Sequence, residues 1–214
     1  MTLAFRTGET VLFIVDSITD CGRFNALHSP LGDGYVRRIS ELVAATQPEL
    51  GLTILNLGIS GDTIRDLARR WERDVMRERP DWLCIKIGVN DMWRSVTGPP
   101  AEAVPVDEYE QTYRRLLEEV RGRLEAKLVL IEPFLAEPDR ADPFRTGLDR
   151  YRSVVAELAW QTGARYVGLQ AAFDRVMVAR TPGYWAPDRV HPTPAGHMLI
   201  ALEVLRSLGV QFEA

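Results

Sequence analysis

Residues 11–15 read VLFIV, and Asp16 and Ser17 follow directly. An uninterrupted apolar run of this length, rich in β-branched side chains, is typical of a short strand buried on both faces of a parallel sheet. Comparable runs recur along the chain, at 53–57 (TILNL), 82–87 (WLCIKI) and 128–131 (LVLI), with a weaker one at 165–168 (RYVG). The sequence therefore predicts five strands.

Longer segments between these runs carry apolar residues at helical spacing. The periodic stripes fall within 36–43, 64–75, 109–124, 151–159 and 194–208. Asp62 or Thr63 could cap the second of these helices, and Pro194 suits the first turn of the last one. Strands that alternate with helices predict an α/β fold, in which a parallel sheet lies between two helical layers as a three-layer α/β/α sandwich.

Two segments rich in proline, glycine and charge are expected to be loops, at 98–105 and 133–148. Long loops beside a parallel sheet often shape a binding pocket. Arg145 and Tyr184 lie in or near such segments, and the sequence assigns them no role. We find no internal repeat or linker, and we interpret residues 1–214 as a single domain.

The composition excludes some classes of function. The net charge is −4 and no run of Lys or Arg is present, so nucleic-acid binding is not favoured. Residues 1–17 contain no apolar stretch long enough for a secretory leader or a membrane span, which predicts a cytoplasmic protein without membrane association, although a secreted chain that had lost its leader would look the same. Cys21 and Cys84 are interpreted as reduced thiols, Cys84 within the core.

Polar residues follow the predicted strands at the points where ligands bind in parallel sheets. Asp16 and Ser17 follow the first strand, 56–61 the end of the second, and 88–91 the third, while 188–191 precede the last helix. Active sites in open α/β sheets lie beyond the carboxyl ends of the strands. We therefore expect these four segments to meet at one edge of the sheet.

Ser17, His191 and Asp188 are the candidates for a catalytic triad. A serine hydroxyl is a weak nucleophile and needs a neighbouring base, and an Asp three residues before a His can orient the imidazole and stabilise its protonated form. Taken alone, Ser17 fits equally well as a cap of the following turn, and Asp188 with His191 as a surface pair. His28 and His197 are more typical of structural histidines.

Gly61 and Asn90 are suited to an oxyanion hole, since a glycine lets a backbone N–H approach a substrate oxygen and an amide is a neutral donor. Both also fit ordinary turn positions. Trp93 and Trp185 could each offer a flat face to a sugar ring or pack against loops, and Asp16 is a further candidate for substrate contact. No spacing matches a zinc, calcium or phosphate site, so we predict neither a metal nor a cofactor.

Four blocks in order carry a family resemblance. VDSITDCGR (15–23), NLGISGDTIRDL (56–67), IKIGVNDMWR (85–94) and DRVHPTPAGH (188–197) resemble the blocks of SGNH (GDSL-type) hydrolases. The resemblance implies a flavodoxin-like fold with five parallel strands. It also implies that Ser17 is the nucleophile and an oxyanion donor through its backbone N–H, with Gly61 and Asn90 as the other donors, His191 as base and Asp188 as its partner.

One position departs from that family pattern. The family's first block normally reads Gly-Asp-Ser, whereas Val15 stands here in place of the glycine. If the glycine has an unusual backbone conformation, a valine would strain it. If the position is ordinary strand, Val15 only continues the apolar run.

Longer segments extend the match: ISGDTIRDLARRWERDV (59–75), IKIGVNDMWR (85–94), VPVDEYEQTYRRLL (104–117) and LIEPF (130–134). They are similar to cytosolic carbohydrate acetylesterases, in particular acetylxylan esterases. This similarity implies a small-molecule ester substrate such as an acetylated xylo-oligosaccharide, no cofactor and a homo-oligomer. Three alternatives stay open: a lipase or acyl-thioesterase of lysophospholipase type, a transferase that moves acetyl groups between sugars, and a catalytically silent carbohydrate-binding domain.

Overall fold

Five parallel strands form the centre of the molecule. The computed structural model describes residues 3–25 and 29–210, and His28 lies outside them. The strand order is β2-β1-β3-β4-β5. Each predicted strand is confirmed to within one residue at either end: β1 (Thr10–Val15), β2 (Thr53–Gly58), β3 (Trp82–Lys86), β4 (Lys127–Ile131) and β5 (Arg165–Val167).

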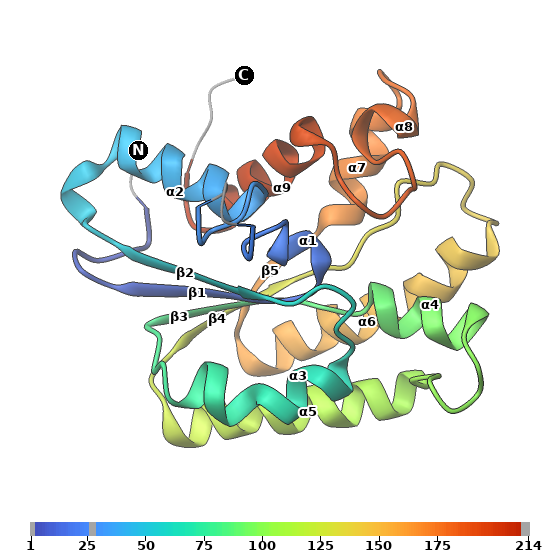
Figure 1. Ribbon diagram of the computed structural model, residues 1–214, viewed down its shortest axis with the longest axis horizontal. Helices are drawn as coiled ribbons and strands as arrows, with labels where there is room; N and C mark the ends of the chain where they lie inside the picture. Colours follow the sequence, from blue (N-terminus) through green and yellow to red (C-terminus); the bar gives the residue numbers. More distant parts are fainter. Residues whose placement is uncertain (1–2, 26–28, 211–214) are drawn as a thin grey trace.

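Helices cover both faces of the sheet, which confirms the three-layer sandwich (Figure 1). One layer contains α2 (Tyr35–Thr46), α7 (Leu169–Met177) and α9 (Pro194–Ser207), and the other contains α3 (Ile64–Trp71), α5 (Val106–Arg123) and α6 (Pro143–Thr162). The apolar stripes read from the sequence face the sheet, as the full burial of Ile39, Leu67 and Leu116 illustrates. No helix within residues 3–25 and 29–210 is long and apolar enough to cross a membrane.

The structure corrects several local expectations. Short helices that periodicity did not indicate are α1 (Ser17–Asp20), α4 (Val89–Thr97), α7 and α8 (Pro182–Trp185). Residues 133–148 are not one loop, because α6 begins at Pro143. The Asp142 side chain accepts hydrogen bonds from two N–H groups of the first turn, and proline suits that turn. After α3 the chain continues as a π-helical turn, Glu72–Met76.

Val15 occupies a backbone conformation that favours glycine. Its φ is +145° at the end of β1, and its side chain is fully buried. Its carbonyl oxygen accepts hydrogen bonds from the N–H of Ile59, at 2.6 Å, and from Nη2 of Arg70, at 3.1 Å. A β-branched residue at positive φ costs roughly 1–3 kcal/mol. Of the two alternatives for this position, the strained one is therefore correct.

This strain can be isolated by comparing Val15→Gly with Val15→Ala. Glycine normally destabilises a strand by about 0.5–1 kcal/mol relative to alanine. At position 15 we expect the reverse order, with Val15→Gly at least as stable as Val15→Ala, because only glycine relieves the positive φ. The free energy of unfolding, measured by urea denaturation, tests this.

The matched control is Val11, which is equally buried in β1 and is not among the residues with positive φ. There we expect Val11→Gly to be less stable than Val11→Ala in the usual way. If both positions show the same order, the strain at Val15 contributes nothing measurable to stability.

Candidate active site

Residues from four separate segments meet beyond the carboxyl ends of the central strands. Ser17 begins α1 directly after β1, and Gly61 lies in the turn between β2 and α3. Asn90 lies in the first turn of α4, just after β3, and His191 lies between α8 and α9. The hydrogen bonds between these segments confirm that they share one edge of the sheet.

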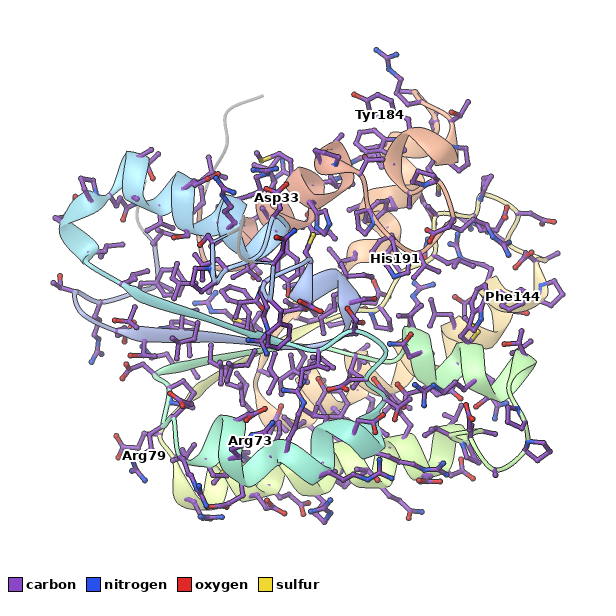
Figure 2. All side chains as sticks on the ribbon, in the orientation of Figure 1. Asp33, Arg73, Arg79, Phe144, Tyr184 and His191 are labelled. Carbon is purple, nitrogen blue, oxygen red and sulfur yellow. The ribbon has the colours of Figure 1, made fainter. Side chains whose placement is uncertain are left out.

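Ser17, His191 and Asp188 form a continuous chain of hydrogen bonds. Ser17 Oγ lies 2.9 Å from His191 Nε2, and His191 Nδ1 lies 2.6 Å from Asp188 Oδ2. Figure 2 shows His191 beside α1. An ionised carboxylate can only accept hydrogen bonds, so Nδ1 carries the ring proton and Nε2 is left as acceptor for the serine hydroxyl.

The carboxylate of Asp188 is fixed by its own loop. Its Oδ1 accepts hydrogen bonds from the N–H of Val190, at 3.0 Å, and of His191, at 2.7 Å. Partial burial acts to raise the pKa of Asp188, but the hydrogen bonds from the His191 ring and from these two N–H groups outweigh it and lower the pKa below its usual value. The group is therefore a stable anion next to the imidazole.

The proposed oxyanion donors are the N–H groups of Ser17 and Gly61 and the side-chain amide of Asn90. The Ser17 N–H is at the first position of α1, where no earlier turn of helix can accept it. Gly61 has φ +86°, and a Cβ built there would meet only Arg94 Nη2 within 4 Å, at 3.8 Å, so the approach to its backbone is open. One N–H of the Asn90 amide donates to the carbonyl of Asp62 at 2.9 Å, and the amide has a second N–H to donate.

Asp16 has no exposed surface to offer a substrate, contrary to the expectation from the sequence. It is fully buried, and both carboxylate oxygens are engaged within the protein. Oδ1 accepts the N–H of Ile18 at 3.0 Å, and Oδ2 pairs at 3.1 Å with Nζ of Lys86, which is also fully buried. Asp16 therefore fixes the turn that carries Ser17. Lys86 was missed, although a lysine inside the apolar run WLCIKI was the available signal.

The two tryptophans differ in how much surface they offer. Trp93 packs at 4.7 Å, centroid to centroid, against Phe144 and keeps 36% of its surface exposed. Trp185 packs edge-on against Tyr184 at 5.0 Å, and its indole nitrogen is buried without a hydrogen-bond partner in the described part of the chain. Contact of either ring with a sugar stays a prediction.

Arg189 fastens the loop that carries Asp188 and His191. Its carbonyl oxygen accepts the N–H of Ala136 at 2.8 Å. Its guanidinium pairs with Glu137 at 3.0 Å and with Asp142 at 3.1 Å, and its φ is +72°. The loop is therefore attached to residues 136–142, which follow β4.

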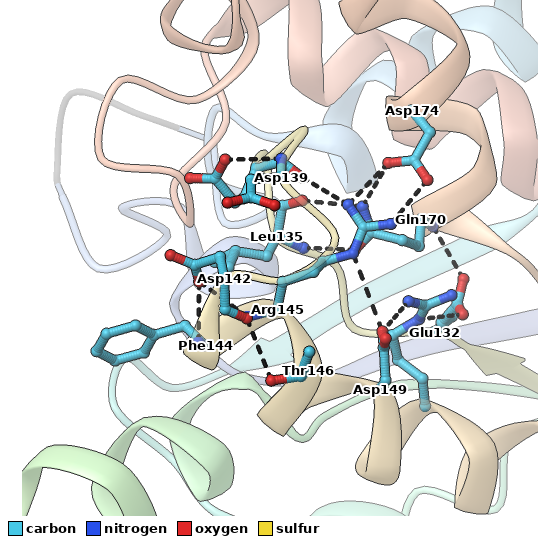
Figure 3. A network of polar contacts seen from close by, with 12 residues as sticks. Glu132, Leu135, Asp139, Asp142, Phe144, Arg145, Thr146, Asp149, Gln170 and Asp174 are labelled. Carbon is cyan, nitrogen blue, oxygen red and sulfur yellow. Dashed lines mark hydrogen bonds and ion pairs between the residues drawn. The ribbon is translucent and has the colours of Figure 1, made fainter.

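That segment is in turn held by α6 and α7 (Figure 3). The amide of Gln170 bonds both the N–H and the C=O of Leu135, at 2.9 Å each. Arg145, only 4% exposed, donates to the carbonyl of Glu137 and pairs with Asp174 at 2.7 Å. The sequence assigned Arg145 no role. In the structure it holds residues 136–142, to which the loop of Asp188 and His191 is attached.

His197 has the structural position expected of it. It is 5% exposed, and its Nδ1 accepts the N–H of Tyr35 at 3.2 Å, while Nε2 lies 3.4 Å from Cys21 Sγ. Burial lowers the pKa of His197 to about 4, so it stays neutral at ordinary pH. No group of three or more His, Cys, Asp or Glu side chains placed to hold a metal ion occurs among residues 3–25 and 29–210.

Comparison with known proteins assigns the family. The family model described as "GDSL-like Lipase/Acylhydrolase family" matches residues 16–199. The chain belongs to this family. It is accordingly a carboxylic ester hydrolase, and the family span includes all four segments of the site.

Relatives of this acylhydrolase resemble it over nearly their whole length. An acetylxylan esterase of Geobacillus stearothermophilus is 43% identical in an alignment of 212 positions that covers 96% of each chain. The crystal structure of that organism's acetylxylan esterase Axe2 has a TM-score of 0.93 at 43% identity and covers 98% of both chains. LAE5, an alpha/beta hydrolase enzyme from the metagenome of Lake Arreo, has a TM-score of 0.92 at 35% identity, over 97% of this chain and 98% of its own. Catalytic mutants of Axe2 replace a serine, an aspartate or a histidine by alanine.

Asp91, next to Asn90, is a buried acid with an unusual pKa. It is fully buried, its Oδ1 accepts the N–H of Ile64 at 2.9 Å, and its Oδ2 has no hydrogen-bond partner among the described residues. Burial raises the pKa of Asp91 to about 7, against 3.8 for an ordinary aspartate.

We expect Asp91 to make the protein less stable as the pH rises. Between the unfolded pKa of 3.8 and the folded pKa of about 7 the folded state binds more protons, so the contribution of Asp91 is lost as the pH rises through about 7. The free energy of unfolding of the wild type, minus that of Asp91→Asn, should fall by at most about 1.4 kcal/mol per pH unit over this range. Urea denaturation at several pH values measures it.

Asp107→Asn is the matched control, since this aspartate is exposed at the start of α5. The free energy of unfolding of the wild type, minus that of Asp107→Asn, should not change comparably with pH. A wild-type-minus-Asp91→Asn difference that is flat with pH would contradict the raised pKa.

Proposed function

We propose that this acylhydrolase is a serine esterase that removes acetyl groups from carbohydrates through an acyl-Ser17 intermediate. The observation that carries the proposal is the 2.9 Å contact of Ser17 Oγ with a His191 ring whose other nitrogen is held by Asp188. His191 Nε2 takes the hydroxyl proton as Oγ attacks the ester carbonyl carbon.

The negative charge of the tetrahedral intermediate needs donors already in place. In this proposal the N–H of Ser17, the N–H of Gly61 and the side-chain amide of Asn90 supply them. As the intermediate collapses, the ester C–O bond breaks and His191 returns its proton to the departing alcohol. A water molecule then attacks the acyl-enzyme with His191 as base, which releases acetate and restores Ser17. No cofactor takes part in this scheme.

The proposed substrate is an acetylated xylo-oligosaccharide. The full-length relative is an acetylxylan esterase, and a variant of it is described as an acetyl-xylooligosaccharide esterase. The same likeness disfavours the lipase or thioesterase, the sugar acetyltransferase and the silent binding domain. We also propose that residues 1–214 act as one domain in a cytoplasmic homo-oligomer. The resemblance to cytosolic acetylesterases supports this proposal. The thiols of Cys21 and Cys84, which form no disulfide, support the compartment alone.

Ser17→Ala is the decisive variant. We expect it to lower kcat by roughly 10⁴ or more with p-nitrophenyl acetate, because the nucleophile is lost. Wild-type protein should prefer the acetate over p-nitrophenyl decanoate and should deacetylate acetylated xylo-oligosaccharides. Near-normal activity of Ser17→Ala would disprove the triad, and a preference for decanoate would move the assignment to a lipase or thioesterase.

Asn90→Ala tests the oxyanion hole separately. Removal of one such donor should lower kcat roughly 10²–10³-fold while KM changes little, because the bond strengthens only in the transition state. Steady-state kinetics with p-nitrophenyl acetate measures both constants. A kcat within a few fold of the wild type would exclude the amide of Asn90 as a donor.

A further inference from the structure

Arg70 is a buried guanidinium beneath the oxyanion segments. It lies on α3 and is 7% exposed. Nη2 donates to the carbonyl of Val15 at 3.1 Å, and Nη1 donates to the carbonyl of Leu57 at 2.8 Å. Nε pairs with Asp62 at 2.7 Å, and Nη1 also pairs with Asp74 at 2.8 Å. The side chain thus joins four segments of the chain.

Two of these partners, Val15 and Asp62, lie close to the proposed oxyanion donors. Val15 is two residues before Ser17, and its carbonyl is held at the strained end of β1. Asp62 directly follows Gly61. The carbonyl of Asp62 also accepts the Asn90 amide at 2.9 Å. A single guanidinium therefore connects through Asp62 to Gly61 and Asn90, and through the carbonyl of Val15 to the end of the strand that precedes Ser17.

We propose that Arg70 is the positioning residue of the oxyanion hole. The inference rests on the proposed function, because it presumes that these donors hold the oxyanion. Arg70 does not touch the substrate. It fixes the turn containing Gly61 against the end of β1, so that the donors keep their spacing before the ester arrives. Such preorganisation matters because a displacement of about 1 Å can reduce a rate roughly 100-fold.

The chemistry of the guanidinium suits this role. Its planar fork donates in several fixed directions at once, which a lysine ammonium on a flexible stem does not reproduce. Other bonds hold the same turn: the Ile59 N–H to Val15, and Arg94 Nη2 to the Gly61 carbonyl at 2.7 Å. We therefore expect variants of Arg70 to fold, but to hold the oxyanion donors less precisely in position.

Two variants, Arg70→Lys and Asp62→Ala, each disrupt the ion pair between Arg70 and Asp62 from one side. We expect each to lower kcat for p-nitrophenyl acetate by about 10- to 100-fold, with KM within about twofold of the wild type. The pH midpoint of kcat/KM should not move, since neither residue contacts His191 or Asp188. In the double variant kcat should fall about as far as in the more impaired single variant, because both changes break the same Arg70–Asp62 connection.

Glu9→Ala is the matched control for loss of a buried carboxylate. Glu9 is 9% exposed at the amino end of the sheet, where it accepts Trp82 Nε1 at 2.6 Å and Lys127 Nζ at 3.0 Å. It should lower the melting temperature and leave kcat unchanged. Arg70→Lys and Asp62→Ala should fall well below it in kcat under conditions where all three are folded.

The inference is overturned if both variants keep kcat within twofold of the wild type, or if their losses of kcat equal that of Glu9→Ala. It is also overturned if the two losses of kcat multiply in the double variant, or if the pH midpoint of kcat/KM shifts. Ser17→Ala, assayed in parallel, separates the two levels of the argument. Full activity there means that the proposed function has failed. An inactive Ser17→Ala beside active Arg70→Lys and Asp62→Ala means that only the role of Arg70 has failed.

Discussion

The parallel pairing of β1 between β2 and β3 is the constraint on which the site depends. Val15 lies opposite Gly58 on one side and Lys86 on the other, so all three strands end level with one another. The residues that continue from these ends are therefore neighbours in space although they are distant in sequence. A shift of register in either pair would separate Ser17 from its proposed oxyanion donors.

Two sets of buried charges support that edge. The pair Asp16–Lys86 fixes the start of α1 from within the sheet, and Arg70 with Asp62 and Asp74 fixes the turn beyond β2. Buried ion pairs are weak sources of stability, because desolvation offsets much of their attraction, and breaking them leaves an uncompensated charge. Their value here lies in geometry. Besides their ionic partners, Asp16 bonds the N–H of Ile18, and Arg70 bonds the carbonyls of Val15 and Leu57.

The sequence was most informative where one physical signal dominated. The strands followed from unbroken apolar runs and the long helices from apolar periodicity, because burial against the sheet determines both. The segments containing Ser17, Gly61, Asn90 and His191 could be placed at one edge because parallel strands share a direction. Family resemblance then supplied roles that composition and spacing could not.

What the sequence did not reveal depends on contacts between distant segments. Asp16 was taken for a substrate contact, because nothing local indicated that Lys86, 70 residues later, neutralises it. The importance of Arg70 lies in bonds to Val15 and Leu57, 55 and 13 residues away. Helix α4 was not indicated by periodicity, because it is only nine residues long and begins three residues after the end of β3.

The placing of Asp188 and His191 on one short loop has a mechanical consequence. Their mutual geometry is set by bonds within four consecutive residues, so it is independent of the sheet. Ser17 belongs to the other end of the chain, 174 residues earlier, and meets the pair through a single hydrogen bond. Arg189, within the same loop, bonds Ala136, Glu137 and Asp142, so the pair is anchored to the segment that follows β4. A displacement of that segment would carry the acid–base pair with it and change the distance from Ser17 Oγ to His191 Nε2.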